Sequence, residues 1–231
     1  KIKAVLVPAG ALDAAALDRM IAESSIDRVV ETLPIKAIAD ILSEGLQAAL
    51  ESRSFGDIEN ELYKYYYATL IKAARGGMKG GLPFLKYVMF EIDIKNIKNL
   101  FRVRAQVAKD ADTLALWIEG GAFKPEELER LTTVESLDEV VDSLKKKVKV
   151  AVLAEALEEL REKKPVYAVE STLTSAQLGQ MDKMSKRNPF SISPLLVYLE
   201  RKRYEVANLR ALARGKESGL SAEILEKYLV M

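Results

Sequence analysis

The chain has 231 residues, 49% of them hydrophobic and 30% charged, and its 35 basic and 34 acidic residues leave a formal net charge of +1. A chain of this size can bury a core, and its balanced charge gives no general electrostatic case for binding nucleic acid or an anionic membrane. The sequence contains neither cysteine nor histidine, which excludes disulfides, a thiolate nucleophile and the commonest metal ligands.

Two features of the sequence argue against a membrane-spanning or exported chain. No run of about 18 apolar residues occurs, and residues 1–10 are too short and too charged for a signal peptide. Because the first residue is Lys rather than Met, we expect the chain to be a segment of a longer product.

The first part of the chain predicts a series of helices. Asp13, and Ser24 or Ser25, are suited to cap two short helices between Gly10 and Leu33. Apolar residues at helical spacing continue beyond Pro34, and breaks that contain glycine separate the longer stretches. The three longer helices are expected over Ile35–Glu51, from about Ile58 to Arg75, and from Pro83, as the first helical residue, to Arg104.

Beyond residue 112 the same series begins again. Residues 117–131 match residues 6–20 at an offset of 111, with Gly121 on Gly10. Residues 136–144 match residues 25–33, and five of these nine positions are identical. Agreement at one offset over most of the unit predicts an internal duplication. We therefore predict an all-α protein of two homologous helical-bundle units, residues 1–112 and residues 113–231.

The last helix of the first unit carries a polar stripe. Asp93, Asn96 and Arg104 lie with Ile97 and Leu100 within about 100° of arc on one side of the helix. Most of the other positions are apolar, so we expect these polar groups to find partners or to face a wet cavity.

The stripe returns 112 residues later near the end of the second unit. There Glu205, Asn208, Arg214 and Lys216 stand at the positions of Asp93, Asn96, Arg102 and Arg104. Two interpretations remain open for both stripes: a buried network that locks one helix against its neighbours, or a surface that meets a partner protein.

These residues resemble a known family. The most specific parts are residues 91–104 and 204–216, together with the LxxxG pattern that opens each unit. They are similar to the C subunit of archaeal A-type and bacterial V/A-type ATP synthases, whose family includes the d subunit of eukaryotic V-ATPases. The resemblance covers essentially the whole chain.

The resemblance implies a fold and a role. Family members have three helical units arranged as a funnel with approximate threefold symmetry, of which residues 1–112 and 113–231 would be the second and third. They couple the rotor shaft, made of the D and F subunits, to the proteolipid (c or K) ring at the cytoplasmic face of the membrane, linking ATP synthesis to proton or sodium transport. The resemblance implies no catalytic residue, cofactor, metal or small-molecule substrate.

Other features carry alternative interpretations. The glycine-rich residues 76–81 precede a helix, but they lack the GK[ST] ending of a phosphate loop, which favours a connector. Residues 145–149 are typical of a solvated helix face. The alternative function is a soluble helical scaffold that binds a partner helix in a groove, and an enzyme would need a nucleotide or metal that stabilises the fold.

Overall fold

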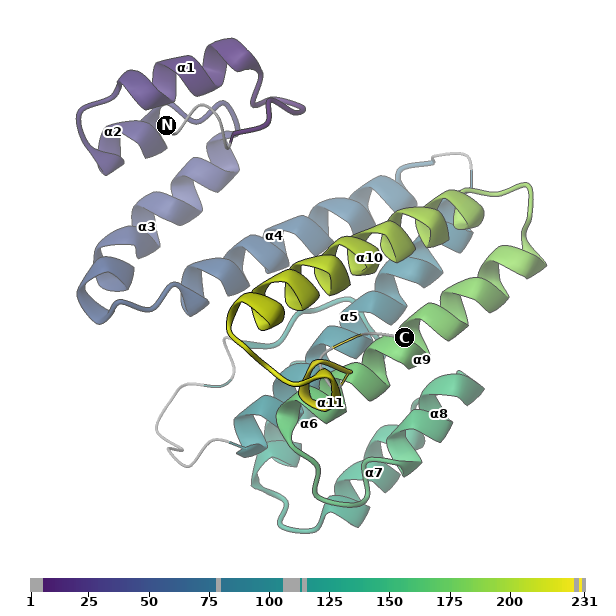
Figure 1. Cartoon of the computed structure of the whole chain (residues 1–231). Helices are drawn as coiled ribbons and strands as arrows, with labels where there is room; N and C mark the ends of the chain where they lie inside the picture. The colour runs from purple at the N-terminus through teal and green to yellow at the C-terminus, as the bar shows by residue number, and fades with distance from the viewer. Residues whose placement is uncertain (1–5, 78–79, 106–112, 114–115, 227–228, 230–231) are drawn as a thin grey trace. The chain divides into compact units, whose positions relative to one another are not determined.

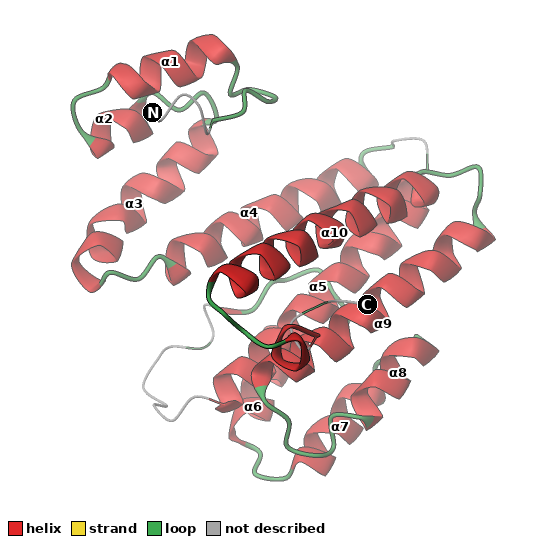
Figure 2. Cartoon of the chain, viewed as in Figure 1, coloured by secondary structure: helices red, strands yellow, loops and turns green. Residues whose placement is uncertain are grey.

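The computed structural model describes residues 6–77, 80–105, 113, 116–226 and 229, and over these residues the protein is all-α. The regular elements of this part of the chain are helices, joined by loops and turns (Figure 2). One isolated bridge pairs Ala9 with Leu12 around Gly10. The all-α prediction is confirmed.

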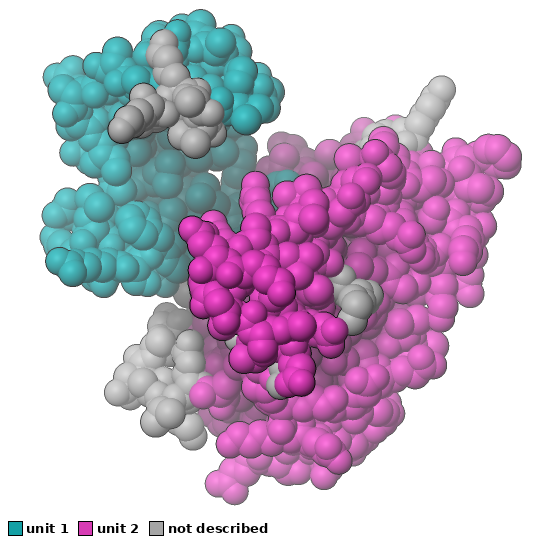
Figure 3. All heavy atoms as spheres, viewed as in Figure 1, with its two compact units in different colours: residues 1–66 teal, residues 67–231 magenta. Residues whose placement is uncertain are grey.

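Close contacts group the chain into two compact units, residues 1–66 and residues 67–231 (Figure 3). In the first unit lie α1 (Ala14–Ala22), α2 (Ile26–Glu31), α3 (Lys36–Ser52) and the first part of α4 (Gly56–Arg75). The side chain of Asp13 accepts a hydrogen bond from the backbone N of Ala16 at 2.7 Å, and the hydroxyl of Ser25 accepts one from Arg28 N at 3.3 Å. Both predicted caps are therefore present.

Helix α4 begins closer to the end of α3 than predicted. Arg53 ends α3 in the left-handed conformation, with φ of 55°, and α4 begins at Gly56 rather than near Ile58. The two helices approach closely at Gly45, where an added Cβ would lie 2.6 Å from Cγ1 of Ile58. A side chain at position 45 would push the helices apart.

The second unit is built on three long helices. They are α5 (Gly81–Ala105), α9 (Val166–Arg187) and α10 (Ser193–Glu217). Helix α9 packs against α5, α10 and α8 (Figure 1). The shorter helices are α6 (Pro125–Thr133), α7 (Leu137–Lys145), α8 (Ala151–Glu158) and α11 (Ala222–Glu226).

Apolar side chains from α5 to α9 form the main core of this unit. Residues without exposed surface come from helices far apart in the chain, among them Ile97, Leu100, Leu128, Leu144, Leu157 and Leu173. Helix α5 begins two residues earlier than predicted, so Pro83 is its third residue rather than its first. A proline is tolerated there because the first four N–H groups of a helix have no partner within the helix.

The helix lengths follow a similar order in the two parts of the chain. In each of the series α1 to α5 and α6 to α10, two short helices come first and two long helices come last. The helix between them is intermediate in length in the first series and short in the second. Ser136 caps α7 as Ser25 caps α2. The boundary near residue 112 and the superposition of the two series stay predictions. The contacts divide the chain between residues 66 and 67 instead, because α5 packs against α6 and α9 of the second series.

Candidate functional site

The polar stripe of α5 faces the residues that follow it in the chain. We call residues 116–135 the joint segment; it consists of a short irregular stretch, a glycine turn, helix α6 and the two residues after it. Helix α5 packs directly against α6. Each of Asp93, Asn96 and Arg104 bonds to the backbone of this segment.

Asn96 holds the start of the joint segment by two hydrogen bonds. Its Nδ2 donates to the carbonyl oxygen of Ile118 at 2.8 Å, and its Oδ1 accepts from the backbone N of Ile118 at 3.0 Å. Asn96 is fully buried, with 0% of its surface exposed. The amide side chain therefore replaces the pairing that a neighbouring strand would give to the backbone of Ile118.

Asp93 holds the glycine turn. Its Oδ1 accepts a hydrogen bond from the backbone N of Ala122 at 2.7 Å. Burial raises the pKa of Asp93 to about 6, and the backbone N–H groups of Ala122 and Phe123 partly oppose this shift. A Cβ added at Gly121 would lie 2.2 Å from Oδ1 of Asp93, so only glycine leaves room for the carboxylate.

Arg104 holds the end of the joint segment. Its Nη1 donates to the carbonyl oxygens of Leu131 and Val134, and its Nη2 donates to that of Glu135 at 3.3 Å. These carbonyls belong to the end of α6 and to the residues after it, where a cation is favoured by the helix dipole.

Arg102 and Lys98, on another side of α5, contact α9. Nε of Arg102 lies 2.6 Å from Oε1 of Glu170, and Nζ of Lys98 donates to Oγ1 of Thr174 at 2.7 Å. Burial lowers the pKa of Lys98 to about 8, against the nearby charge of Glu170. Helix α5 is thus fixed to both α6 and α9.

The second predicted stripe lies on α10, and its side chains are less buried. Glu205 is exposed and pairs with Lys202 one turn earlier at 2.6 Å. Arg214 and Lys216 are exposed, whereas Asn208 is partly buried. The structure therefore brings the stripe of α5 together with its joint segment, and it leaves three of the four residues of the α10 stripe exposed.

A cluster of ionisable side chains between α5 and α10, which includes two buried glutamates, was not predicted. The hydroxyl of Tyr87 donates to Oε1 of Glu200 at 3.4 Å, and Arg203 lies 2.7 Å from Oε2 of Glu200 and 4.0 Å from Oε1 of Glu91. Burial, with the neighbouring charge of Glu200, raises the pKa of Glu91, and burial raises that of Glu200. The only available signal was an acid inside each apolar run, which does not reveal the partner.

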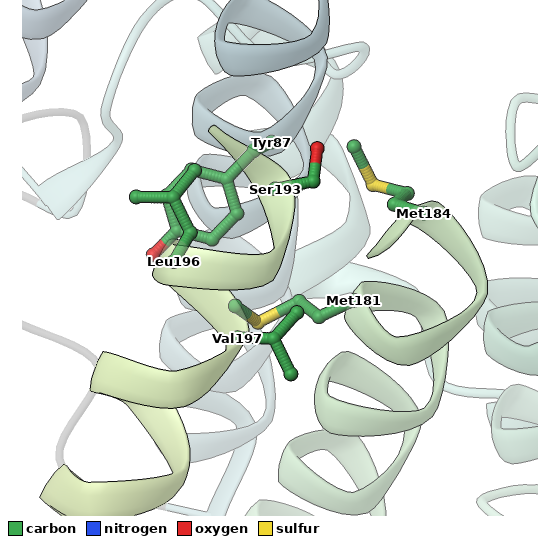
Figure 4. Close-up of a pocket in the computed structure, with 6 residues that line it drawn as sticks. All are labelled: Tyr87, Met181, Met184, Ser193, Leu196 and Val197. Atoms are coloured by element: carbon green, nitrogen blue, oxygen red, sulfur yellow. The ribbon is translucent and has the colours of Figure 1, made fainter. Parts of the chain in front are cut away.

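A small apolar pocket lies where α5, α9 and α10 meet (Figure 4). Its cavity volume is only about 10 Å³, and it is lined by Tyr87, Met181, Met184, Ser193, Leu196 and Val197. Ligand sites usually have about 300–1,000 Å³ and several converging polar groups. This pocket is a packing gap between helices rather than a metabolite site.

The described residues offer no grouping of three or more acidic side chains suited to a metal ion. Within the same part of the chain, none of the helices combines the length and the apolar character needed to cross a bilayer. The contacts of the stripe are bonds to backbone, made by amide, carboxylate and guanidinium groups.

Comparison with known proteins places this arrangement in a family. The family model for the ATP synthase (C/AC39) subunit matches residues 1–228. The A-type ATP synthase C subunit of Halorubrum lacusprofundi is 34% identical over 235 aligned residues, which cover 100% of this chain and 66% of that protein. The corresponding C subunits of Halobacterium salinarum and Methanosarcina barkeri are each 32% identical, over 100% and 98% of this chain.

The chain spans just under two-thirds of the length of these relatives, 66% for Halorubrum and 61% for Methanosarcina. The resemblance to the C subunit that was inferred from the two long helices is confirmed by these matches. The chain belongs to the ATP synthase (C/AC39) subunit family.

Proposed function

We propose that the protein is a noncatalytic part of the central stalk of a rotary A-type ATP synthase. In this role it is a socket that couples the rotor shaft, formed by the D and F subunits, to the proteolipid ring at the cytoplasmic face of the membrane. Family membership over residues 1–228 is the observation that carries the proposal.

The contacts of α5 support a mechanical role. A coupling protein must pass torque between helices without yielding, and close packing with satisfied polar groups gives that stiffness. Helix α5 bonds to the joint segment at its start, its turn and its end, and it bonds to α9 on another side. A load applied to α5 therefore reaches both neighbours through several bonds at once.

The two halves would belong to the three-unit funnel of the family, with residues 1–112 and 113–231 as its second and third units. In that arrangement the wide end receives the shaft and the narrow end sits on the ring. Proteins of this kind perform no chemistry of their own, in keeping with a stripe whose polar groups are directed at backbone.

Binding of both rotor parts tests the proposal. The immobilised chain is incubated with the D–F shaft, and separately with detergent-solubilised proteolipid ring; we expect both to be retained and to be released together with the chain. Retention of neither partner would overturn the proposal and favour the alternative of a helical scaffold for another protein.

The noncatalytic part of the proposal has its own test. A nucleotide or ion that binds the folded state stabilises it and so raises its melting temperature. The stabilisation is about 2.7 kcal/mol when the free ligand is at a hundredfold excess over Kd. We expect ATP with Mg²⁺ to leave the melting temperature of the chain unchanged. A saturable rise would contradict a purely mechanical role.

A further inference from the structure

Two buried carboxylates lie where side chains of α5 and α10 meet. Glu91 on α5 is 8% exposed, and Glu200 on α10 is 9% exposed. Oε2 of each is buried and accepts no hydrogen bond within the described part of the chain. An ionised carboxylate in such a place loses its hydration without a full set of donors in return, which is unfavourable. Both side chains therefore depend on positive charge nearby.

One guanidinium serves both carboxylates. Nη2 of Arg203 lies 2.7 Å from Oε2 of Glu200, although not aligned for a hydrogen bond, and its Nη1 lies 4.0 Å from Oε1 of Glu91. The Arg203 side chain is 55% exposed, and it also lies over the ring of Tyr204 at 5.1 Å. Solvent therefore screens part of its charge. Two ionised glutamates beside one arginine would leave one negative charge without compensation.

The neighbouring tyrosines do not supply the missing charge. The hydroxyl of Tyr87 donates to Oε1 of Glu200 at 3.4 Å, and the hydroxyls of Tyr67, on α4, and Tyr87 lie within hydrogen-bonding reach of Glu91. Burial, with the charges of both glutamates, raises the pKa of Tyr87. Its hydroxyl therefore keeps its proton and stays neutral.

The lysine of the cluster is directed at α9. Lys98 acts on Glu200 through its charge. Its Nζ, however, donates to the hydroxyl of Thr174 on α9 at 2.7 Å, and the charge of Glu170 on α9 also acts on it. Burial lowers the pKa of Lys98 to about 8, so its charge decreases as the pH approaches that value. Lys98 therefore compensates the glutamate pair only in part.

We propose that Glu91 and Glu200 form a proton-binding site, which holds one proton at neutral pH and weakens the contact of α10 with α5 when that proton is lost. The proton replaces the missing positive charge, because a carboxylic acid is neutral and can donate a hydrogen bond where a carboxylate only accepts. Two carboxylates that share one proton in this way titrate as a unit. The inference does not depend on a role in a rotary motor.

The site acts on one helix boundary in particular. Helix α10 packs against α9 and α11 along its backbone. Its polar contacts with α5 are those of Glu200 with Tyr87 and of Arg203 with Glu91. Loss of the proton leaves a negative charge on each side of this boundary, and like charges repel. The weakening is therefore expected between α10 and α5, whereas α9 keeps its packing.

The direction of the pH dependence follows from burial. Burial, with the charge of Glu200, raises the pKa of Glu91 above its ordinary value of 4.5, and burial also raises that of Glu200. The folded state therefore binds the proton more tightly than the unfolded state does. The stability that the proton contributes is present below pH 4.5 and is lost as the pH rises through the raised pKa of the pair.

Glu91→Gln tests the proposal, because glutamine keeps the shape of the protonated acid and cannot ionise. Urea unfolding of both proteins between about pH 5 and 7.5 gives their folding equilibrium constants. The constant of the wild type relative to that of Glu91→Gln should fall with rising pH, by up to about tenfold per pH unit where one proton is lost. Asp93 is present in both proteins, so its titration largely cancels. A ratio that does not change with pH would overturn the proposal, because a merely structural acceptor predicts that result.

Glu205→Gln is the matched control. Glu205 lies on the same helix, is exposed and pairs with Lys202 at 2.6 Å. Its replacement should leave the pH dependence of the wild type unchanged. An equal change in Glu205→Gln and Glu91→Gln would refute a specific role of the buried pair.

Infrared spectroscopy observes the proton directly, through the carbonyl band of a protonated carboxyl group. The difference between wild type and variant at neutral pH should show the same band for Glu91→Gln and for Glu200→Gln. Removal of either carboxylate leaves the other alone with Arg203, where it ionises. Absence of the band from both difference spectra would overturn the shared proton. Arg203→Gln, which changes a half-exposed side chain, should keep the band to higher pH than the wild type, and earlier loss would also overturn it.

Hydrogen exchange locates the weakened contact. At about pH 7.5 the amides of α10 should exchange faster in the wild type than in Glu91→Gln, whereas those of α9 should exchange alike. At about pH 5 both helices should exchange alike in the two proteins, because the wild-type pair is then protonated. Equal protection of α10 at both pH values would refute the weakening of its contact with α5.

Discussion

Replacement of Asn96 by alanine is the most direct test of how α5 holds the joint segment. The side chain is fully buried and makes two hydrogen bonds, to the backbone N and to the carbonyl oxygen of Ile118. Alanine leaves both backbone groups buried without these partners. Each unsatisfied group costs about 1–3 kcal/mol, so Asn96→Ala should lower the free energy of unfolding by about 2–5 kcal/mol.

The single tryptophan provides the assay. Trp117 is buried and directly precedes Ile118, and its Nε1 donates to Oε2 of Glu129 at 3.0 Å. Its fluorescence during urea unfolding therefore reports on the joint segment rather than on residues 1–66. The free energy follows by linear extrapolation to zero urea.

Asn208→Ala is the matched control. Asn208 stands at the equivalent position on α10 and is only partly buried, so its replacement should cost less than about 1 kcal/mol. If the two variants differ by less than about 0.5 kcal/mol, the bonds to Ile118 do not stabilise the fold as argued.

Three further substitutions test the rest of the joint, and a fourth, in α9, is a control. Gly121→Ala should destabilise the protein by about 1–3 kcal/mol, because its Cβ would lie 2.2 Å from Oδ1 of Asp93; Gly179→Ala in α9, whose Cβ would meet its nearest neighbour at an ordinary 3.5 Å, should instead raise the melting temperature. Burial raises the pKa of Asp93 in the folded state from 3.8 to about 6. The folded state therefore binds the proton of Asp93 more tightly than the unfolded state does. The stability that this proton contributes is present below pH 4 and is lost as the pH rises through 6. Urea titrations at each pH give the free energy of unfolding of the wild type minus that of Asp93→Asn. This difference should fall between pH 4 and 7, by no more than about 3 kcal/mol. A rise in the difference would contradict the burial of Asp93. Arg104→Lys keeps the charge but loses the planar fork, so urea unfolding should show a loss of about 1–3 kcal/mol; an unchanged midpoint would mean that charge alone suffices.

The order of the helices could be predicted from the sequence because periodicity and caps are local signals. Asp13 and Ser25 cap α1 and α2 as expected. Helix starts beside glycine were less predictable: α4 begins at Gly56 and α5 at Gly81. Glycine has a low intrinsic helix propensity, and the packing of the following residues decides whether it joins the first turn.

The partners of the polar stripe could not be predicted from side-chain patterns. Asp93, Asn96 and Arg104 bond mainly to backbone groups, and every residue carries those groups, so nothing in the sequence singles out residues 118, 122 or 131–135. The pair Glu91 and Glu200 was missed for another reason. The contacts of Tyr87 with Glu200 and of Arg203 with Glu91 join residues more than a hundred positions apart, and helical periodicity carries no information at that separation.

Bonds to backbone allow a contact of this kind to tolerate changes in the side chains of the segment being held. The sequence around Gly121 and that around Gly10 differ at most positions, yet both keep a glycine at the turn. An amide, a carboxylate and a guanidinium that hydrogen-bond to the backbone tolerate such differences in side chains, because the backbone N–H and carbonyl groups are present at every such position. The glycine is the exception, since a Cβ there would collide with the carboxylate. The bonds from Asp93, Asn96 and Arg104 therefore require space at the turn, whereas they leave most side chains of the segment free to vary.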